Sequence, residues 1–412
     1  MMYFVPSWYH GNEYKENEQY WYRRRTVTEF DDSVKQVQMF NRNNIMDYKI
    51  LNLSYCPNFR HFLHRQSVFH APYWSCFDAI QEIKRTKVDI LSYRDLMWPD
   101  HTEFVYTPFC IVAYVHHEKY AEVHFGEDGN MIEVFLFQSE IMVRKNVYDD
   151  RGFLSTTIVY ENNQPIYEQY LDEKGNWKLL HFFEDDHIEI NSENPYYLIG
   201  NKRFAFDSLN YDSMESLIEE VFSTYLDEMT EKSDIFCLSM HTLHHDLLES
   251  LFTQRKTILS FYQNRMELFE DAELKSLIRS TNYCIVDSKH KVRPLEKYAG
   301  QTLPIVDITP FDTRADFGIS QQLTVQNILV PIDSIEQSKL EALIVLFAKY
   351  FETNETARVH FFTRDSNWNR VDTVLSFVRQ VLNVNGLDER LALKETNDKA
   401  EFDLDEDEKV PI

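Results

Sequence analysis

Glycine is unusually scarce in this chain, which has 9 glycines among 412 residues. A typical usage of about 7% would give roughly 29. Phosphate-binding loops of the Gly-x-Gly-x-x-Gly and Walker types need several glycines, because the backbone must approach the phosphates closely. The only close pair, Gly126 and Gly129, falls in an expected hairpin turn. The sequence therefore argues against nucleotide binding through such a loop, and a Gly-x-Ser-x-Gly nucleophile elbow is absent as well.

Five of the nine glycines lie in or beside one stretch, from about Phe104 to Phe206, in which short runs alternate between apolar and polar residues. Turn-forming clusters such as Asp149–Gly152 separate the runs. Period-two runs between turns at this spacing predict an antiparallel meander. The expected strands include Phe104–Val115, Met131–Phe137, Glu140–Val147, Phe153–Tyr160, Ile166–Leu171 and Trp177–Phe183.

Strand and helix patterns alternate on both sides of this stretch, which predicts parallel sheets with crossover helices. Before it, we expect strands at Met2–Trp8 and Tyr48–Leu53 and a helix over Glu29–Phe40. After it, we expect a helix at Ser213–Met229 and strands at Asp234–Leu238, Thr257–Phe261, Tyr283–Val286 and Leu303–Ile308. A further unit has strands at Val325–Ile332 and Val359–Phe362, a helix at Ser334–Phe351 with a Ser334/Gln337 capping box, and a helix at Asn369–Leu382.

The predicted fold class is therefore α/β, with an antiparallel β domain inserted into, or appended to, the first of two α/β lobes. The expected domains are residues 1–103 (first lobe, N-terminal part), 104–206 (antiparallel β domain), 207–322 (first lobe, continued), 323–400 (second lobe) and 401–412 (acidic, solvated tail).

The net charge and the cysteine content limit which binding partners and which cellular compartment are expected. The 42 Lys+Arg and 67 Asp+Glu give a net charge of −25, which disfavours nucleic-acid binding. The N-terminus lacks the features of a secretory signal, and no apolar run is long enough for a membrane span. The five widely spaced cysteines are expected to be reduced thiols. We therefore expect a cytosolic protein, with peripheral membrane contact through a partner left open.

Histidines provide the sharpest candidate metal ligands. If residues 241–245 are helical, His241 and His245 are four apart on one face, as zinc-ligand pairs are. However, Thr242 stands where zincins have glutamate, so exposed histidines at a strand end or helix start are the favoured interpretation. His61/His64 and His116/His117 are interpreted as polar surface or packing residues, and no Cys-x-x-Cys pair suggests structural zinc.

The charged clusters have structural explanations. Asp31/Asp32, Asp149/Asp150 and Asp185/Asp186 fall at an expected helix start or in turns, where carboxylates are common. Asp403 and Asp405 mimic a chelating pair but lie in the acidic tail. For Arg23–Arg25, flanked by Trp21 and Tyr22, a solvated, salt-bridged surface is favoured, and an acidic partner or phosphate is the alternative.

Several strings resemble one known family, that of the first of three accessory secretory proteins of the accessory Sec system in streptococci and related Gram-positive bacteria. The resemblance runs from the N-terminus to about residue 390. A segment from Asp150–Ser155 through Gln169–Asp172 separately resembles the extended β-sheet domain of glycosyltransferases that modify serine-rich repeat adhesins. The family strings are Phe4–Tyr9 (FVPSWY), Glu29–Phe40 (EFDDSVKQVQMF), Tyr55–Gln66 (YCPNFRHFLHRQ) and Tyr73–Asp78 (YWSCFD).

The resemblance implies a glycosyltransferase-B-like fold, with two Rossmann-like lobes and the extended β domain inserted in the first. It implies action with two sister accessory secretory proteins in the cytosol, delivering glycosylated serine-rich repeat adhesins to a SecA-type motor and a SecY-type channel. It also implies no transferase activity and no cofactor. Family members continue beyond the roughly ninety residues of the second lobe, so we expect this lobe to be incomplete.

The second lobe lacks the residues that a retaining transferase of this fold needs. Such an enzyme places two glutamates, separated by seven residues, beside a glycine-rich donor loop. From Val330 onward no such pair exists, the nearest spacing being Glu395 and Asp403, and Gly386 is the lobe's only glycine. The resemblance implies an export component, and together with this absence it predicts a non-catalytic one with no catalytic, cofactor-binding or metal-binding residues. The alternatives are an active glycosyltransferase for serine-rich adhesins and a zinc hydrolase built on His241 and His245.

Overall fold

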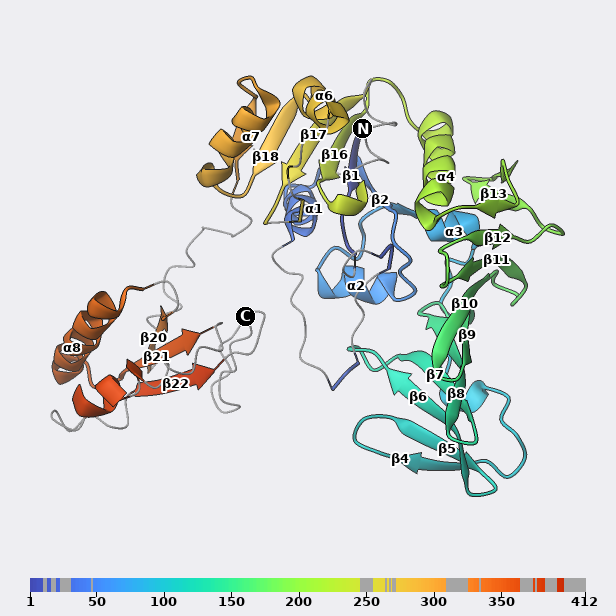
Figure 1. The fold of residues 1–412 in the computed structure, drawn as a ribbon, viewed down its shortest axis with the longest axis horizontal. Helices are drawn as coiled ribbons and strands as arrows, with labels where there is room; N and C mark the ends of the chain where they lie inside the picture. Colours follow the sequence, from blue (N-terminus) through green and yellow to red (C-terminus); the bar gives the residue numbers. More distant parts are fainter. Residues whose placement is uncertain are drawn as a thin grey trace. The chain divides into compact units, whose positions relative to one another are not determined.

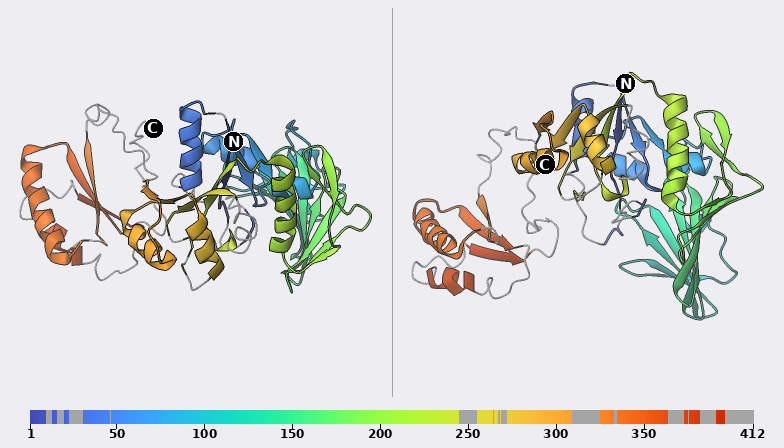
Figure 2. Two further views of the ribbon diagram at one scale, coloured as in Figure 1. Left: turned by 90° about the horizontal axis from the view of Figure 1, so that it is seen from above. Right: turned by 45° about the horizontal axis from the view of Figure 1, so that its top comes forward.

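The computed structural model describes residues 1–9, 13–15, 20–22, 31–45, 47–244, 255–263, 265–266, 268, 272–308, 325–332, 335–363, 373–374, 376–381 and 391–395. It contains two compact units, Met1–Phe311 and Asp312–Ile412, each with a parallel sheet of its own (Figure 1, Figure 2). Among the described residues, no helix combines the length and the apolar character that crossing a membrane requires.

A seven-stranded parallel sheet forms the centre of the first unit, in the order β19-β18-β17-β16-β1-β2-β3. The strand order reverses between β1 and β16, because β2 and β3 extend the sheet on one side of β1 and β16 to β19 extend it on the other. The predicted parallel pairing is confirmed. The strands are β1 (Met2–Val5), β2 (Tyr48–Asn52), β3 (Tyr73–Ser75), β16 (Ile235–Ser239), β17 (Lys256–Phe261), β18 (Tyr283–Val286) and β19 (Ile305–Asp307).

Both faces of this sheet are buried, which explains why its strands are apolar without alternation. Tyr3 and Val5 belong to one buried cluster and Phe4, between them, to another. Helix α4 buries its apolar stripe in the first cluster, and α1 buries Val34 and Val37 in the second. The helices are α1 (Asp32–Arg42), α2 (Phe59–Arg65), α3 (Cys76–Ile80), α4 (Met214–Met229), α6 (Ala272–Ser280) and α7 (Val292–Ala299).

The predicted meander forms a ten-stranded antiparallel sheet in the order β15-β12-β11-β10-β9-β8-β7-β6-β5-β4, which extends away from the parallel sheet (Figure 1). Its β10–β12 end shares a core with α3 and α4, through Tyr170 and Leu179. Its β4–β8 end has a separate core. The strands are β4 (Glu103–Tyr106), β5 (Ile111–Val115), β6 (Glu118–Phe125), β7 (Met131–Gln138), β8 (Ile141–Asp149), β9 (Phe153–Glu161), β10 (Gln164–Leu171), β11 (Trp177–Phe182), β12 (Ile188–Ile190) and β15 (Asn210–Tyr211), and β13 (Tyr196–Ile199) pairs with β14 (Lys202–Ala205) in a separate hairpin.

The single strand predicted at Phe104–Val115 is wrong, because this segment is the β4–β5 hairpin. The Thr107 hydroxyl oxygen accepts hydrogen bonds from the backbone N–H groups of Phe109 and Cys110, at 3.2 and 2.9 Å. A threonine that satisfies the following backbone in this way stabilises a turn, and the apolar residues on either side hide that signal.

The second unit contains a three-stranded parallel sheet, β20-β21-β22, with an apolar core of its own. Its elements are β20 (Gln326–Pro331), α8 (Gln337–Thr353), β21 (Ala357–Thr363) and β22 (Leu391–Glu395), and residues 373–374 and 376–381 are also helical. Glu336 precedes α8 and makes no side-chain cap hydrogen bond. Ser334 of the predicted capping box lies outside the described residues.

Candidate functional site

The carboxyl ends of β1, β16 and β17 lie at the point where the strand order reverses. In open α/β sheets ligands bind at such a switch point, beside the N-terminus of a helix. Here the helix is α1, which follows β1 in the chain. This edge of the sheet is therefore the first place to look for a ligand site.

Two carboxylates and one arginine occupy this edge. Asp31 caps α1 by accepting hydrogen bonds from the backbone N–H groups of Ser33 and Val34. Arg265, which follows β17, donates to Asp31 at 2.9 Å and to Asp32 at 2.6 Å. It also donates to the Ser7 hydroxyl, just after β1, at 2.6 Å. The chain's own anions thus fill the place at the helix N-terminus that a ligand phosphate would otherwise take.

The Asp32 carboxylate is buried at the centre of this network. Burial raises the pKa of Asp32, the neighbouring Asp31 charge raises it further, and Arg265 opposes both. The hydroxyls of Ser239 and Ser260 donate to the same carboxylate. Each oxygen of this buried group is therefore engaged within the chain, as a buried charge requires.

A buried histidine–tyrosine pair lies at the end of β16. The His244 Nδ1 lies 2.7 Å from the Ser239 carbonyl oxygen, so Nδ1 carries the proton, and the Tyr9 hydroxyl donates to Nε2 at 2.6 Å. Burial lowers the pKa of His244 to about 3 and that of the nearby His241 to about 4. His244 is consequently a neutral imidazole with both nitrogens occupied, and it is not available as a general base.

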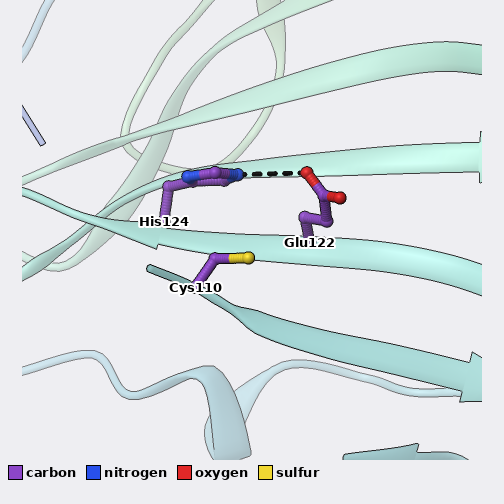
Figure 3. Close-up of side chains that lie close together, drawn as sticks. All are labelled: Cys110, Glu122 and His124. Carbon is purple, nitrogen blue, oxygen red and sulfur yellow. Dashed lines mark hydrogen bonds and ion pairs between the residues drawn. The ribbon is translucent and has the colours of Figure 1, made fainter. Parts of the chain in front are cut away.

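One further cluster brings together possible metal ligands. Cys110, Glu122 and His124 offer sulfur, oxygen and nitrogen atoms within 4.8 Å of one another, the only such group in the described residues. Figure 3 shows His124 directed at the Glu122 carboxylate, 3.2 Å away, with the Cys110 thiol beside them. However, the ammonium of Lys119 lies 2.6 Å from Glu122 and already balances its charge. Three ligands are also one fewer than a structural zinc site uses, so we interpret the cluster as an ion-paired patch.

Sequence comparison identifies the family. A family model described as accessory secretory protein 1 of the accessory Sec system matches residues 1–412. The chain belongs to this family. The curated family member from Streptococcus gordonii is 32% identical over 342 residues, which cover 82% of this chain and 63% of that relative. The match thus spans less than two thirds of the relative's length.

Structural comparison confirms the predicted fold of this accessory Sec family member. The crystal structure of accessory secretory proteins 1, 2 and 3 of Streptococcus pneumoniae matches with a TM-score of 0.79 and 26% identity, covering 96% of this chain and 78% of that chain. The pneumococcal O-GlcNAc transferase GtfA, solved with UDP and GlcNAc, matches with a TM-score of 0.58 and 11% identity, covering 97% of this chain and 76% of that chain. The chain therefore has a glycosyltransferase-B-like fold, and at this identity the second match concerns the fold alone.

Most histidines singled out in the sequence of this accessory Sec family member have ordinary structural surroundings. His241 precedes a 3₁₀ turn, Thr242–His244, and its Nδ1 accepts from the Leu243 backbone N–H at 3.1 Å. His245 lies outside the described residues. The remaining candidates are placed as follows: His61 lies 3.6 Å from Asp128, His64 packs edge-on to Phe69, and His116 and His117 form the tight β5–β6 turn with positive φ.

The acidic pairs also have structural roles, although not always within their own turns. Asp150 accepts from the backbone N–H groups of Arg60 and His61 in α2, and Asp149 pairs with Arg151. Asp185 and Asp186 pair with His187 and His181. Glu395 lies on β22. Arg23–Arg25, Gly386, Asp403 and Asp405 lie outside the described residues.

Sequence reasoning missed Arg265, Ser7, Ser239 and His244. The sequence predicts a helix start at Asp31 and Asp32, which is confirmed, but nothing near them in the sequence indicates their counter-ion. Arg265 is 233 residues from Asp32. A lone arginine in a polar segment carries no local pattern, so only the folded sheet reveals this pairing.

Proposed function

We propose that this chain is a non-catalytic component of the accessory Sec export system. It acts in the cytosol with two sister accessory secretory proteins, and peripherally at the membrane through the translocon. Its task is to help deliver glycosylated serine-rich repeat adhesins to the SecA-type motor. The family membership supports this proposal, as does the similarity to a structure that contains accessory secretory proteins 1, 2 and 3.

One observation supports a scaffold role for the first lobe, because its switch point is occupied by the chain's own charged groups. An enzyme that binds a phosphorylated or otherwise anionic ligand at this edge needs the N-terminus of α1 and the Arg265 guanidinium to be available. Both are held by Asp31 and Asp32. Displacing these carboxylates would leave buried charges unpaired, which costs several kcal/mol. We infer that this lobe serves as a scaffold for protein contacts.

We also propose the domain boundaries expected from the sequence, with the antiparallel insert at residues 104–206. Tyr170 and Leu179 of this insert share a core with α3 and α4 of the first lobe. The insert is not a separable module at its β10–β12 end, because removing it would expose this core. Partner binding is therefore best tested on the intact chain.

The direct test mixes the intact chain with the two purified sister proteins and follows the mixture by size-exclusion chromatography with light scattering. The expected result is a single complex that contains all three proteins. Omitting each sister in turn shows which one this chain contacts. A chain that elutes alone from every mixture contradicts the proposal.

The glycosyltransferase-B-like fold favours one alternative, an active transferase for serine-rich adhesins. Calorimetric titration with UDP-GlcNAc separates the two functions, because a transferase has to bind its donor. The scaffold function predicts no measurable heat of binding, and micromolar binding with turnover would establish the alternative. The zinc hydrolase on His241 and His245 predicts stoichiometric zinc, which a metal assay of the purified protein detects.

A further inference from the structure

A hollow lies beside β3, an edge strand of the seven-stranded parallel sheet. It is a cleft of about 500 Å³ bounded by α2, β3, α3 with the loop that follows it, and the β13–β14 turn. All three residues of β3 line it. The cleft is distinct from the switch point, because none of its lining residues belongs to the Arg265 network.

The lining of the cleft carries more cationic than acidic side chains, although the chain as a whole is strongly acidic. Four cations line it, and among the described residues Asp78 is its only acidic lining residue. Arg151 is matched by Asp78 and Asp149, at 2.8 and 2.7 Å. Arg85 lies only loosely near its carboxylates, at 3.7 and 3.9 Å.

The other two cations are Arg60 and Lys84. Among the described residues their side chains form no close ion pair, but the Arg60 charge interacts with the Asp150 carboxylate and offsets part of the rise that burial causes in the pKa of Asp150. Neighbouring carboxylates outside the lining reduce this charge, because Asp150 interacts with Arg60 and Glu173 accepts the backbone N–H groups of Lys84 and Arg85. The positive charge that remains accessible in the cleft belongs mainly to Lys84, which is exposed, and to Arg60, which is half-buried.

Aromatic side chains form an apolar wall beside these cations. The Arg60 guanidinium lies 5.7 Å from the centre of the Phe69 ring, and Phe69 is 42% exposed. Trp74 stacks on Tyr225 at 4.2 Å between ring centres and leaves part of its surface in the cleft. The ring of Phe69 restrains Arg60 by a cation–π contact. Apolar walls also strengthen charge pairing, because they lower the local dielectric constant.

We propose that this cleft binds an acidic, extended peptide segment of a partner protein. Charge complementarity supplies the acidic character, and the aromatic wall accommodates apolar side chains between the acidic ones. Among the described residues, no strand pairs with the outer side of the edge strand β3. A peptide in an extended conformation can therefore add to this edge as a further strand. The proposal is independent of the export function, since its test requires neither the sister proteins nor an adhesin.

The test measures the fluorescence anisotropy of a labelled decapeptide of alternating glutamate and valine on titration with the full chain. Alternation places the carboxylates on one side of an extended peptide and the valines on the other. We expect saturable binding that weakens at least about tenfold in the Arg60→Gln/Lys84→Gln double variant. We also expect weakening as the salt concentration rises from roughly 50 to 300 mM, because salt screens exposed charges.

The matched control is Lys289→Gln/Lys297→Gln, which removes the same charge from exposed positions at and beside α7. It should leave the affinity within about twofold, because distant exposed charges are screened. Phe69→Ala keeps every charge of the cleft and should weaken binding by a smaller factor than the double variant.

Three results would overturn the proposal. They are equal weakening in the two double variants, equal binding of the glutamine–valine peptide, and full competition by inorganic phosphate at low millimolar concentration. The first result would show that the peptide responds only to the total charge of the protein. The second would show an apolar site that does not select for charge, and the third would show a site for small anions. Circular dichroism of each variant confirms that the fold is retained.

Discussion

The switch-point network and the cleft beside β3 are built on the same parallel sheet and use charge in opposite ways. At the switch point, Arg265 is paired with two aspartates that are almost fully buried. In the cleft, Arg60 and Lys84 form no close ion pair among the described residues, although Asp150 interacts with Arg60, and the two side chains are half-buried and exposed, respectively. The first group stabilises the chain, whereas the second leaves charge available for a ligand.

Burial, and not residue type, separates the charges that stabilise the fold from those available to a ligand. A buried charge without a partner costs several kcal/mol, so folding selects a complete network. An exposed charge costs little when unpaired, because water solvates it. Three predictions test this contrast, in order of decreasing effect.

Arg265→Met should destabilise the chain most. It leaves Asp31 and Asp32 side by side and nearly buried without their counter-ion, which costs about 3–5 kcal/mol. Urea denaturation at pH 7 measures the free energy of unfolding. The control is Lys202→Gln, which breaks the exposed pair with Glu228 and should cost less than about 1 kcal/mol. Equal losses in the two variants would mean that the switch-point network is no more structural than a surface pair.

The second prediction concerns pH. The folded-state pKa of His244 is about 3, below the ordinary 6.5, because burial disfavours the imidazolium. Below pH 6.5 the unfolded chain therefore binds a proton that the folded chain does not bind until about pH 3. This contribution to stability is fully present above about pH 6.5 and is lost as the pH falls toward 3. Between pH 7 and pH 5 the loss is about 2 kcal/mol.

Comparing His244→Gln with the parent chain at both pH values isolates this effect. Between pH 7 and pH 5, the free energy of unfolding of the variant should fall by about 2 kcal/mol less than that of the parent chain, because glutamine does not titrate. An unaltered pH dependence in His244→Gln would show that the buried imidazole is protonated in the folded state.

The smallest effect is expected in the cleft. Arg60→Gln and Lys84→Gln should each change the free energy of unfolding by less than about 0.5 kcal/mol, because neither side chain completes a buried network. The same urea titration measures this. If either variant lost as much free energy of unfolding as Arg265→Met, these cations would stabilise the fold as Arg265 does, and the contrast between the two regions would be contradicted.

Patterns a few residues long predicted most of the fold. The turn Asp149–Gly152 illustrates this, because Gly152 adopts φ +90° and joins β8 to β9 where the sequence predicts a turn. Ser213 likewise caps α4 by accepting the Ser216 backbone N–H, at the predicted helix start. Turns and helix caps depend on residues only a few positions apart, so they can be recognised in the sequence without knowledge of the fold.

Elements that depend on distant partners were not predicted. β22 (Leu391–Glu395) contains leucine, alanine, lysine and glutamate, which favour helix in isolation. It is a strand because β21 offers it a parallel edge. The sequence does not predict the β4–β5 hairpin for a related reason, because the division of this segment into two strands is evident only from their antiparallel pairing.

The two kinds of sheet and their order along the chain follow from the sequence alone, which also argues against a glycine-rich phosphate-binding loop. These properties follow from periodicity, turn residues and composition, which are local. The fold alone reveals that Arg265 pairs with Asp31 and Asp32, and that Arg60 and Lys84 form no close ion pair within the described residues. The reason is physical, because the strength of a charge interaction depends on distance through space and on burial, and neither quantity can be read from position in the chain.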